Sequence, residues 1–266
     1  MTEWNAAEYA RLSALQAAMA DEVLSLLRGH LRGDERVLDV GCGNGKVTRE
    51  IASMVPRGSV VGVDASAKMV QFAAAAGVGS RGGFPAANLS FQVVDARRLP
   101  FHDEFDLVVS FNALHWVAEK EQPLALRGIC AALKARGHAR LRFVARGERK
   151  SLENVIEETA HSPRWEKHFA GHCDPYLHMS PEEYVALAGR CGLRVDSVEM
   201  KDHAWDFGSP AAFAAFGTVT FVEWSQHVPE SERAAFVADA LSRYRLVAGD
   251  DHTFRYYQMD VVARRA

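Results

Sequence analysis

The feature that most constrains the fold is an apolar run that passes into three regularly spaced glycines. Residues 36–40, Arg-Val-Leu-Asp-Val, are typical of a buried strand. The turn that follows is Gly41, Cys42, Gly43, Asn44 and Gly45. Glycine lets the backbone turn sharply and approach a ligand where a Cβ atom would intrude. The helix expected next would present free backbone N–H groups to that ligand.

Strands and helices alternate through the first half of the chain. Further apolar runs typical of strands lie at 58–64, 89–94, 105–110 and 137–145, with helical patterns at 66–76 and 122–133. This alternation predicts an α/β fold with a parallel sheet covered on both faces. Such sheets bind ligands beyond the carboxyl ends of their strands.

The pattern changes after Ala145. Residues 148–180 are polar and irregular, and Ser180-Pro181-Glu182-Glu183 is typical of a helix start. Residues 210–244 are expected to be mostly helical. We predict a single domain over 1–266, made of an N-terminal helical lid (1–35), a ligand-binding core (36–145), two substrate-side insertions (146–192 and 206–252) and two final strands (193–205 and 254–265).

The glycine spacing distinguishes two kinds of ligand. A dinucleotide-binding turn, G-x-G-x-x-G, would need glycine where the chain has Lys46. The observed pattern, an acid (Asp39) followed by G-x-G-x-G, resembles the first motif of class I methyltransferases. That resemblance implies that the turn holds the methionine part of S-adenosylmethionine, with Asp39 near its amino group.

Two further acids follow the next strands. Asp64 ends the second strand, where a carboxylate can accept hydrogen bonds from both ribose hydroxyls. The resemblance implies that Asp95, after the third strand, accepts a bond from the adenine amino group. Taken alone, such acids often only cap helices, and a methionine often only packs in a core; their order on consecutive strands favours a cofactor site. The remaining residues expected to contact the cofactor are Ala65, Met69, Ala96, Phe111 and Asn112.

A narrower resemblance rests on residues 110–117, Ser-Phe-Asn-Ala-Leu-His-Trp-Val, and on the opening Trp4-Asn5 with Tyr9. These segments look like those of the trans-aconitate and juvenile-hormone-acid methyltransferase group. The resemblance spans nearly the whole chain, strongly in the first 145 residues. It implies a Rossmann-like, mostly parallel seven-stranded sheet with helices on both faces and helical insertions capping the ligand edge.

The resemblance also implies an S-adenosylmethionine-dependent methyltransferase (EC 2.1.1) that acts on a small molecule and releases S-adenosylhomocysteine. O-methylation of a carboxylic acid or phenol is the preferred hypothesis. Methylation of a malonyl carrier protein is found among similar sequences. The alternatives are N- or C-methylation of a natural-product or quinone-pathway metabolite, and a non-catalytic cofactor-binding module. A dinucleotide oxidoreductase is disfavoured by Lys46.

His115 is the candidate catalytic residue. A carboxylate acceptor, with a pKa near ~4, is already ionised, whereas a phenol, with a pKa near ~10, needs a base. His115 would serve as a base or an orienting donor, and the alternative is a histidine packed under the cofactor and bonded to backbone. The residues expected to face the acceptor are Trp4, Tyr9, Gln16 and Trp116.

Four histidines gather in the polar stretch: His161, His168, His172 and His178. His168 and His172 would share a helix face and could ligate a metal. Gly171 and Pro175 make a continuous helix doubtful, so surface or pocket-lining histidines are preferred and no metal is predicted.

The composition limits the partners. A formal net charge of -3 gives no basic footprint, so no nucleic acid is expected. The four cysteines form no C-x-x-C pair, which disfavours zinc and disulfides. Without a signal-peptide pattern or an apolar run near ~20 residues, a cytoplasmic protein that does not enter membranes is expected. The oligomeric state stays open.

Overall fold

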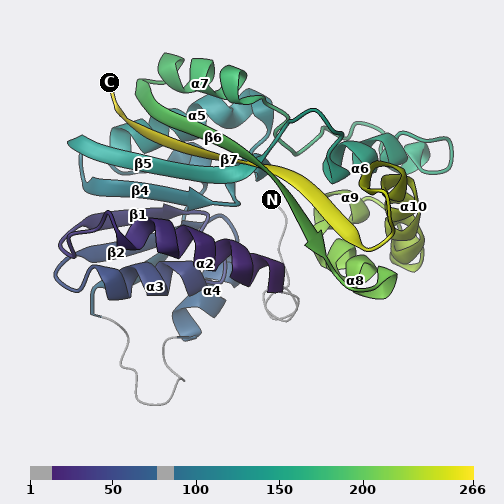
Figure 1. The fold of residues 1–266 in the computed structure, drawn as a ribbon, viewed down its shortest axis with the longest axis horizontal. Helices are drawn as coiled ribbons and strands as arrows, with labels where there is room; N and C mark the ends of the chain where they lie inside the picture. The colour runs from purple at the N-terminus through teal and green to yellow at the C-terminus, as the bar shows by residue number, and fades with distance from the viewer. Residues whose placement is uncertain (1–13, 77–86) are drawn as a thin grey trace.

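The computed structural model describes residues 14–76 and 87–266 of the chain (Figure 1). Its first half alternates strands and helices in the order α2 (Ala14–Arg28), β1 (Arg36–Val40), α3 (Lys46–Met54), β2 (Ser59–Asp64), α4 (Ala67–Ala75), β3 (Leu89–Val93), β4 (Phe105–Phe111), α5 (Gln122–Ala132) and β5 (Leu133–Ala145). The second half contains α6 (Leu152–Ala160), α7 (Pro181–Arg190), β6 (Leu193–Asp206), α8 (Pro210–Thr220), α9 (Val222–Ser225), α10 (Glu230–Ala248) and β7 (Thr253–Arg265).

The seven strands form one sheet in the order β3-β2-β1-β4-β5-β7-β6. Strand β7 is antiparallel to both of its neighbours, and the other neighbouring strands pair in parallel. The mostly parallel seven-stranded sheet predicted from the sequence is therefore confirmed. The chain leaves β1 toward β2 and β3 on one side and returns to β4 on the other, so a crevice is expected beyond the ends of β1 and β4.

Helices cover both faces of the sheet because its buried side chains alternate. Val37 of β1 packs with α2 and α3, and its neighbour Leu38 packs in a second cluster with α5 and α7. Both faces are apolar, as a parallel sheet requires. Figure 1 shows α2 and α3 on one side of the strands and α5 and α7 on the other.

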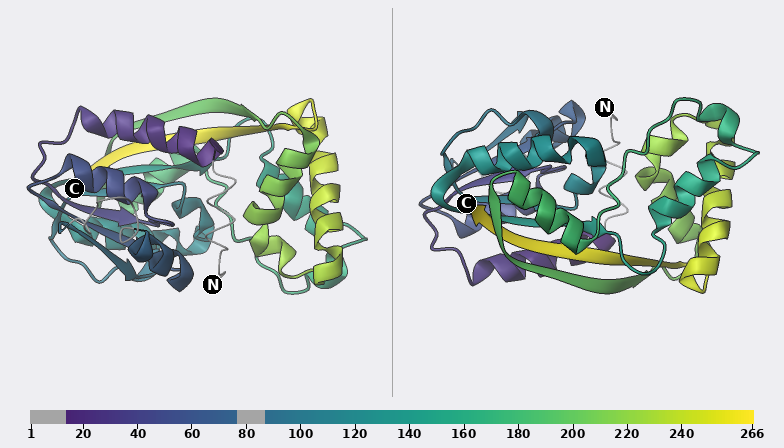
Figure 2. Two further views of the ribbon diagram at one scale, coloured as in Figure 1. Left: turned by 90° about the horizontal axis from the view of Figure 1, so that it is seen from below. Right: turned by 90° about the horizontal axis from the view of Figure 1, so that it is seen from above.

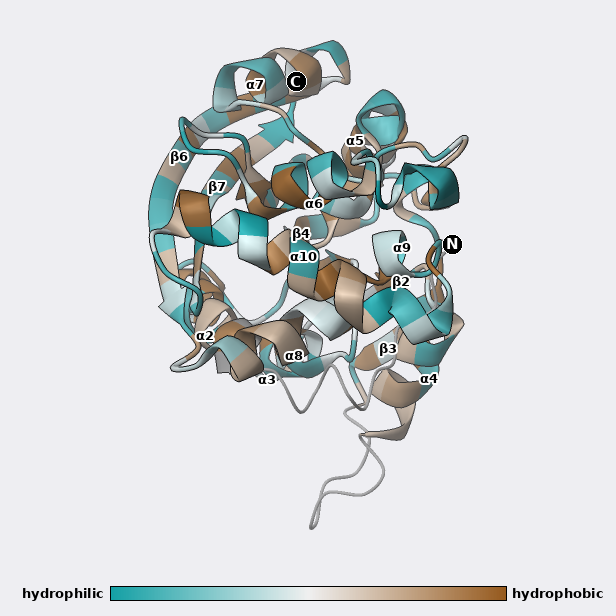
Figure 3. Ribbon diagram, turned by 90° about the vertical axis from the view of Figure 1, so that its right-hand side faces the viewer, coloured by the Kyte–Doolittle hydropathy of each residue, from teal (hydrophilic) through white to brown (hydrophobic). Residues whose placement is uncertain are grey.

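The remaining helices form a separate layer beyond the carboxyl ends of the strands. Helices α6, α8, α9 and α10 lie to the right of the sheet in Figure 1, and the long strands β6 and β7 reach out to them (Figures 1 and 2). Figure 3 looks onto this layer, with α10 in front. Its core is aromatic and includes Trp165, Phe213, Trp224, Phe236 and Tyr244.

Some boundaries differ from those predicted. Residues 148–180 are not irregular throughout, because Ser151 and Asn154 cap each other at the start of α6. Asparagine in place of the usual Glu or Gln hides this capping box in the sequence. The helix start predicted at Ser180 is confirmed, with Glu183 as its reciprocal partner. Strand β5 begins at Leu133 rather than Gly137.

No described helix is both long enough and apolar enough to cross a bilayer.

Candidate functional site

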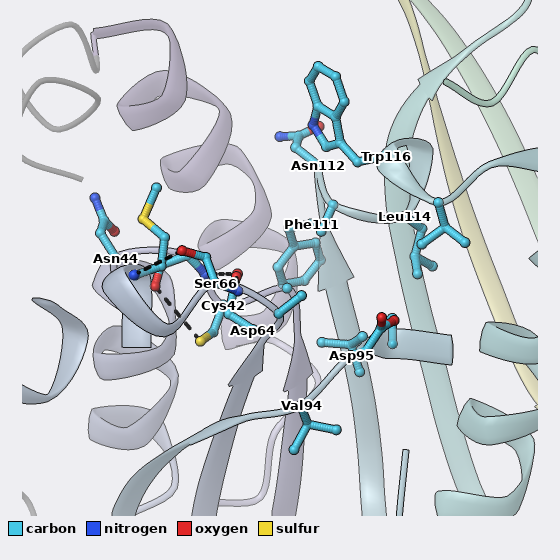
Figure 4. A pocket seen from close by; sticks show the side chains of 18 of the residues that line it. Cys42, Asn44, Asp64, Ser66, Val94, Asp95, Phe111, Asn112, Leu114 and Trp116 are labelled. Atoms are coloured by element: carbon cyan, nitrogen blue, oxygen red, sulfur yellow. Dashed lines mark hydrogen bonds between the residues drawn. The ribbon is translucent and has the colours of Figure 1, made fainter. Parts of the chain in front are cut away.

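A cavity of about 440 Å³ opens at the crevice beyond β1 and β4 (Figure 4). Four of its walls follow strands: the glycine turn follows β1, and three more loops follow β2, β3 and β4. Met19 and Ala20 of α2, Pro175, and Glu223 of α9 also line it. The predicted residues that line it are Gly41, Cys42, Gly43, Asn44, Asp64, Ala65, Met69, Asp95, Ala96, Phe111, Asn112 and Trp116. Asp39, Gly45 and His115 do not line this cavity.

The turn after β1 depends on left-handed glycines. Gly41 has φ 79° and Gly43 has φ 53°. A Cβ atom on Gly41 would lie 2.1 Å from the Cβ atom of Ala113, so glycine is what lets this turn meet the loop after β4. A Cβ atom on Gly43 would meet nothing within 4 Å and would project from the cavity wall.

Gly45 has a packing role instead. It has φ 71°, and a Cβ atom there would lie 2.8 Å from Ala73 and 2.7 Å from the ring of Phe91. Glycine therefore lets the start of α3 approach α4 and β3. The sequence placed Gly45 among the cofactor contacts, whereas the structure places it behind the turn.

Asp39 lies beneath the cavity. Its side chain is 2% exposed, and its Oδ2 accepts a hydrogen bond from Thr48 Oγ1 at 2.7 Å. In a strand it shares a face with Val37, which packs toward α3, so its carboxyl points away from the crevice. Burial raises the pKa of Asp39 to about 7, and the hydrogen bond from Thr48 opposes that rise.

Asp64 joins the first two loops. Its Oδ2 accepts a hydrogen bond from the backbone N–H of Gly43 at 2.9 Å, and its Oδ1 accepts one from Ser66 at 2.9 Å. Ser66 in turn caps α4 by accepting from the backbone N–H of Met69. The carboxylate thus fixes the glycine turn against the start of the next helix.

Asp95 forms an ion pair that the sequence did not suggest. It accepts from the backbone N–H of Arg97 at 2.9 Å and pairs with the same residue's guanidinium. Hydrogen bonding from the Arg97 guanidinium lowers the pKa of Asp95 against the effect of burial, so the carboxyl is ionised. Arg97 also donates to Glu121 at 2.7 Å. Arg97 and Glu121 both line the cavity. They are 24 positions apart in the chain, so no local motif predicts their pairing.

His115 is buried between Trp116 and Tyr176. The ring centroids of His115 and Tyr176 are 4.9 Å apart, and Nδ1 accepts a hydrogen bond from the backbone N–H of Val144 at 3.2 Å. Burial lowers the pKa of His115 to about 3, so the ring is neutral. Because Nδ1 is an acceptor, the single proton lies on Nε2. His115 can therefore donate a hydrogen bond, but its basic lone pair is occupied.

A second, smaller cavity of about 70 Å³ adjoins the first. Met19, Asn112 and Trp116 line both. The other residues around the smaller cavity are Leu15, His115, Val144, Glu153, Tyr176, Phe216, Thr220 and Phe254. They come from α2, β5, α6, α8, β7 and the connections between these elements, and apart from His115 no local sequence pattern points to them.

The predicted acceptor residues have different outcomes. Trp4 and Tyr9 lie outside the described residues. Gln16 belongs to α2, and its side chain is not among those described. Trp116 lines both cavities and packs against Tyr176 and Trp224, with ring centroids 5.2 and 6.1 Å away.

His172 and His178 of the polar stretch pair with nearby acids, whereas Nε2 of His168 is buried without a hydrogen-bond partner among the described residues. His178 Nε2 lies 2.7 Å from Asp174, and His172 Nε2 lies 3.3 Å from Glu157. Burial opposes protonation of His178, but Asp174 outweighs it and raises the pKa. Within residues 14–76 and 87–266, no set of three or more His, Cys, Asp or Glu side chains is arranged to hold a metal.

The sheet order, the side-chain-free turn after β1 and the acids after β2 and β3 define a class I S-adenosylmethionine-dependent methyltransferase. A family model described as a methyltransferase domain matches residues 37–137. The chain is 31% identical to trans-aconitate 2-methyltransferase of Streptomyces avermitilis over 73% of this chain and 70% of that protein. It is 29% identical to juvenile hormone acid O-methyltransferase of Bombyx mori over 63% of this chain and 59% of that protein.

Solved structures agree on the fold. The YcgJ protein of Bacillus subtilis superposes with a TM-score of 0.64 at 19% identity, covering 92% of this chain and 99% of that one. Phosphoethanolamine N-methyltransferase 2 of Haemonchus contortus, solved with phosphomonomethylethanolamine and S-adenosylhomocysteine, gives a TM-score of 0.61 at 17% identity, covering 98% of this chain and 57% of that one. The chain belongs to the class I methyltransferases and is an enzyme that uses S-adenosylmethionine.

Proposed function

We propose that this enzyme methylates a carboxylate oxygen of a small organic acid. In this proposal S-adenosylmethionine occupies the larger cavity and the acceptor enters from the side of Trp116. The observation that carries the proposal is the hydrogen bond from the backbone N–H of Val144 to Nδ1 of the buried His115, which leaves the ring a donor with no free lone pair. Such a histidine cannot remove the proton of a phenol. It suits a nucleophile that is already ionised, such as a carboxylate.

The cavity fits the cofactor in shape and chemistry. Gly43 leaves open space where any larger residue would project from the wall. Asp64 offers carboxylate oxygens for ribose hydroxyls, and Asp95 is ionised and lines the cavity. Met69 is buried and adds an apolar surface for the adenine ring. When bound, S-adenosylmethionine supplies a methyl carbon made electrophilic by its sulfonium.

The protein's task is then to orient the acceptor and exclude water. Holding two reactants in line contributes on the order of 7–11 kcal/mol to such a reaction. Asn112 and Trp116 lie where the two cavities meet, so they would position the acceptor carboxylate. His115 Nε2 donates from the smaller cavity, and the aromatic cluster behind Trp116 keeps that side dry.

The names of relatives support the same acceptor chemistry, since trans-aconitate and juvenile hormone acid are both carboxylic acids. The test is a screen with S-adenosylmethionine labelled in its methyl group, run against matched panels of aliphatic acids, phenols and amines. We expect label in an ester that mild base releases. Label that survives base would contradict carboxyl methylation. Tight binding of S-adenosylmethionine without turnover on any panel would favour a non-catalytic cofactor-binding module.

A further inference from the structure

The smaller cavity contains buried hydrogen-bonding groups that the protein does not satisfy. Glu153, in the first turn of α6, is 5% exposed, and its Oε2 has no hydrogen-bond partner in the described part of the chain. Oγ1 of Thr220, at the end of α8, is likewise buried and unpartnered among the described residues. Both residues line the cavity.

Unsatisfied groups of this kind are costly. A buried donor or acceptor left without a partner costs about 1–3 kcal/mol, and native proteins pair nearly all of them. Glu153 and Thr220 reach the cavity from two different helices, which makes a local packing accident a poor explanation. Polar atoms of a bound molecule would satisfy these groups.

The cavity has a mostly apolar wall with a few polar groups. No Lys or Arg is among the described residues that line it. Arg142, on β5 two positions before Val144, lines neither cavity; its Nη2 pairs with Glu22 at 2.7 Å, and its Nε and Nη1 have no hydrogen-bond partner among the described residues. Burial raises the pKa of Glu153, which favours its neutral form, while hydrogen bonding to Ser151 and Tyr176 and the nearby His178 oppose the rise. An ionised group brought here would lose its hydration without gaining a counter-ion.

The size of the cavity limits what can enter. Its volume of about 70 Å³ corresponds to roughly five water-sized atoms. Aromatic and aliphatic side chains form the rest of the wall, including Phe216 and Phe254. The occupant is therefore a short apolar segment that ends in an uncharged hydrogen-bonding group.

We propose that the smaller cavity takes the non-reacting end of the acceptor, where Glu153 and Thr220 hydrogen-bond to an uncharged hydroxyl or carbonyl oxygen. The acceptor is then a short hydroxy or keto acid, and a di- or tricarboxylate is excluded. This inference rests on the proposed carboxyl methylation and specifies its substrate class.

The test compares acids that differ only at the far end: hexanoate, 6-hydroxyhexanoate and adipate, with trans-aconitate as a tricarboxylate. We expect kcat/KM to be highest for the hydroxy acid and lowest for the two polycarboxylates. Thr220→Val removes one neutral hydrogen bond and should raise KM for the hydroxy acid about 3- to 10-fold. It should leave KM for hexanoate unchanged. Equilibrium binding of the same acids to enzyme saturated with S-adenosylhomocysteine should follow the same order.

Glu153 allows a matched pair of variants. Glu153→Leu should abolish the preference for the hydroxyl end, whereas Glu153→Gln, which resembles the neutral acid, should retain it. The control is Glu158→Gln, an exposed residue on the same helix that pairs with Lys150. Affinity for S-adenosylhomocysteine reports whether each variant is folded.

Two outcomes separate the proposals. If acids are esterified but adipate is preferred, or if the hydroxyl preference survives in both Thr220→Val and Glu153→Leu, this inference is wrong and carboxyl methylation stands. If no acid in the series yields a base-labile ester, carboxyl methylation fails and this inference fails with it.

Discussion

The two halves of the site are built in different ways. On the cofactor side, the predicted contacts lie on loops that follow strands, and Asp64 bonds two of these loops together through Gly43 and Ser66. On the acceptor side, residues from α6, α8 and β7 meet Trp116 only through the aromatic cluster of the outer helices. Backbone geometry organises the first half, and side-chain packing organises the second.

This difference separates two kinds of specificity. The loops at strand ends are positioned by the sheet itself, and Glu223 of α9 is the residue of the outer helices that lines the cofactor cavity among those described. The acceptor half can change by substitutions in α6 or α8 without disturbing those loops. Changes on one side should therefore alter cofactor affinity, and changes on the other should alter KM or turnover for the acceptor.

The largest effect is expected from Gly41→Ala. An alanine there must adopt φ 79° and place its Cβ atom 2.1 Å from that of Ala113. Strain and overpacking together cost about 3 kcal/mol, and the turn can relieve them only by moving away from Ala113, which deforms the cavity. If binding must restore the original turn, affinity for S-adenosylhomocysteine by calorimetry falls by up to roughly 100-fold. The control is Gly208→Ala, with φ 74° and no atom within 4 Å of the added Cβ, which should lose stability but retain affinity. Wild-type affinity in Gly41→Ala would mean that this contact does not shape the cavity.

Asp64→Ala should cause the next largest loss of cofactor affinity after Gly41→Ala. Removing a charged acceptor of the ribose hydroxyls weakens cofactor binding by roughly 1.5–3 kcal/mol, about 10- to 150-fold. Asp64→Asn keeps one acceptor oxygen and should lose less. With cofactor saturating, KM for the acceptor should stay constant in both variants. Unchanged cofactor affinity in Asp64→Ala would show that the ribose binds elsewhere.

The sequence could predict most of the cofactor side because its signals are local. Asp64 and Asp95 each follow a strand, and the left-handed turn at Gly41 and Gly43 is readable from glycine spacing alone. The orientation of Asp39 was not readable, since both faces of a parallel sheet are apolar and alternation gives no sign of direction. It lies under the turn, bonded to Thr48.

The acceptor side could not be predicted for the opposite reason. Glu153 and Thr220 are 67 positions apart in the chain and approach only because α6 and α8 pack around a common core. Helix α6 was not predicted because Asn154 replaces the usual Glu or Gln in its capping box. Contacts of this kind depend on tertiary packing, which strand and turn patterns do not encode.

Asp39 gives a pH test of the cofactor half. Its folded pKa of about 7 lies above the ordinary 3.8, so between these values the folded state holds a proton that the unfolded chain has lost. Stability from this residue is therefore greatest at acid pH and falls as pH rises toward 7. Between about pH 5.5 and about pH 7.5, the free energy of unfolding measured with denaturant should fall by roughly 2 kcal/mol more in wild type than in Asp39→Asn. Equal losses would mean that Asp39 is ionised throughout this range.

The smallest effect is expected on kcat in variants of His115. These variants distinguish a hydrogen-bond donor from a general base. Loss of one neutral hydrogen bond in His115→Ala should lower kcat about 10-fold while cofactor affinity is retained. His115→Gln can still accept from Val144 and donate into the smaller cavity, so it should recover part of that loss. Exposed His102 provides the control, and His102→Ala should behave as wild type.

The pH profile of kcat completes the test at His115. With a pKa of about 3, His115 stays neutral from pH 5 to pH 8 and should contribute no ionisation there. If His115 were a base, kcat would rise with pH through the pKa of the histidine, and this rise would disappear in His115→Gln. Finding that rise would show that His115 acts as a base. A large loss of cofactor affinity in His115→Ala would show that His115 supports the cofactor side instead of the acceptor side. Absence of the rise would leave the acceptor's own ionisation as the source of the nucleophile.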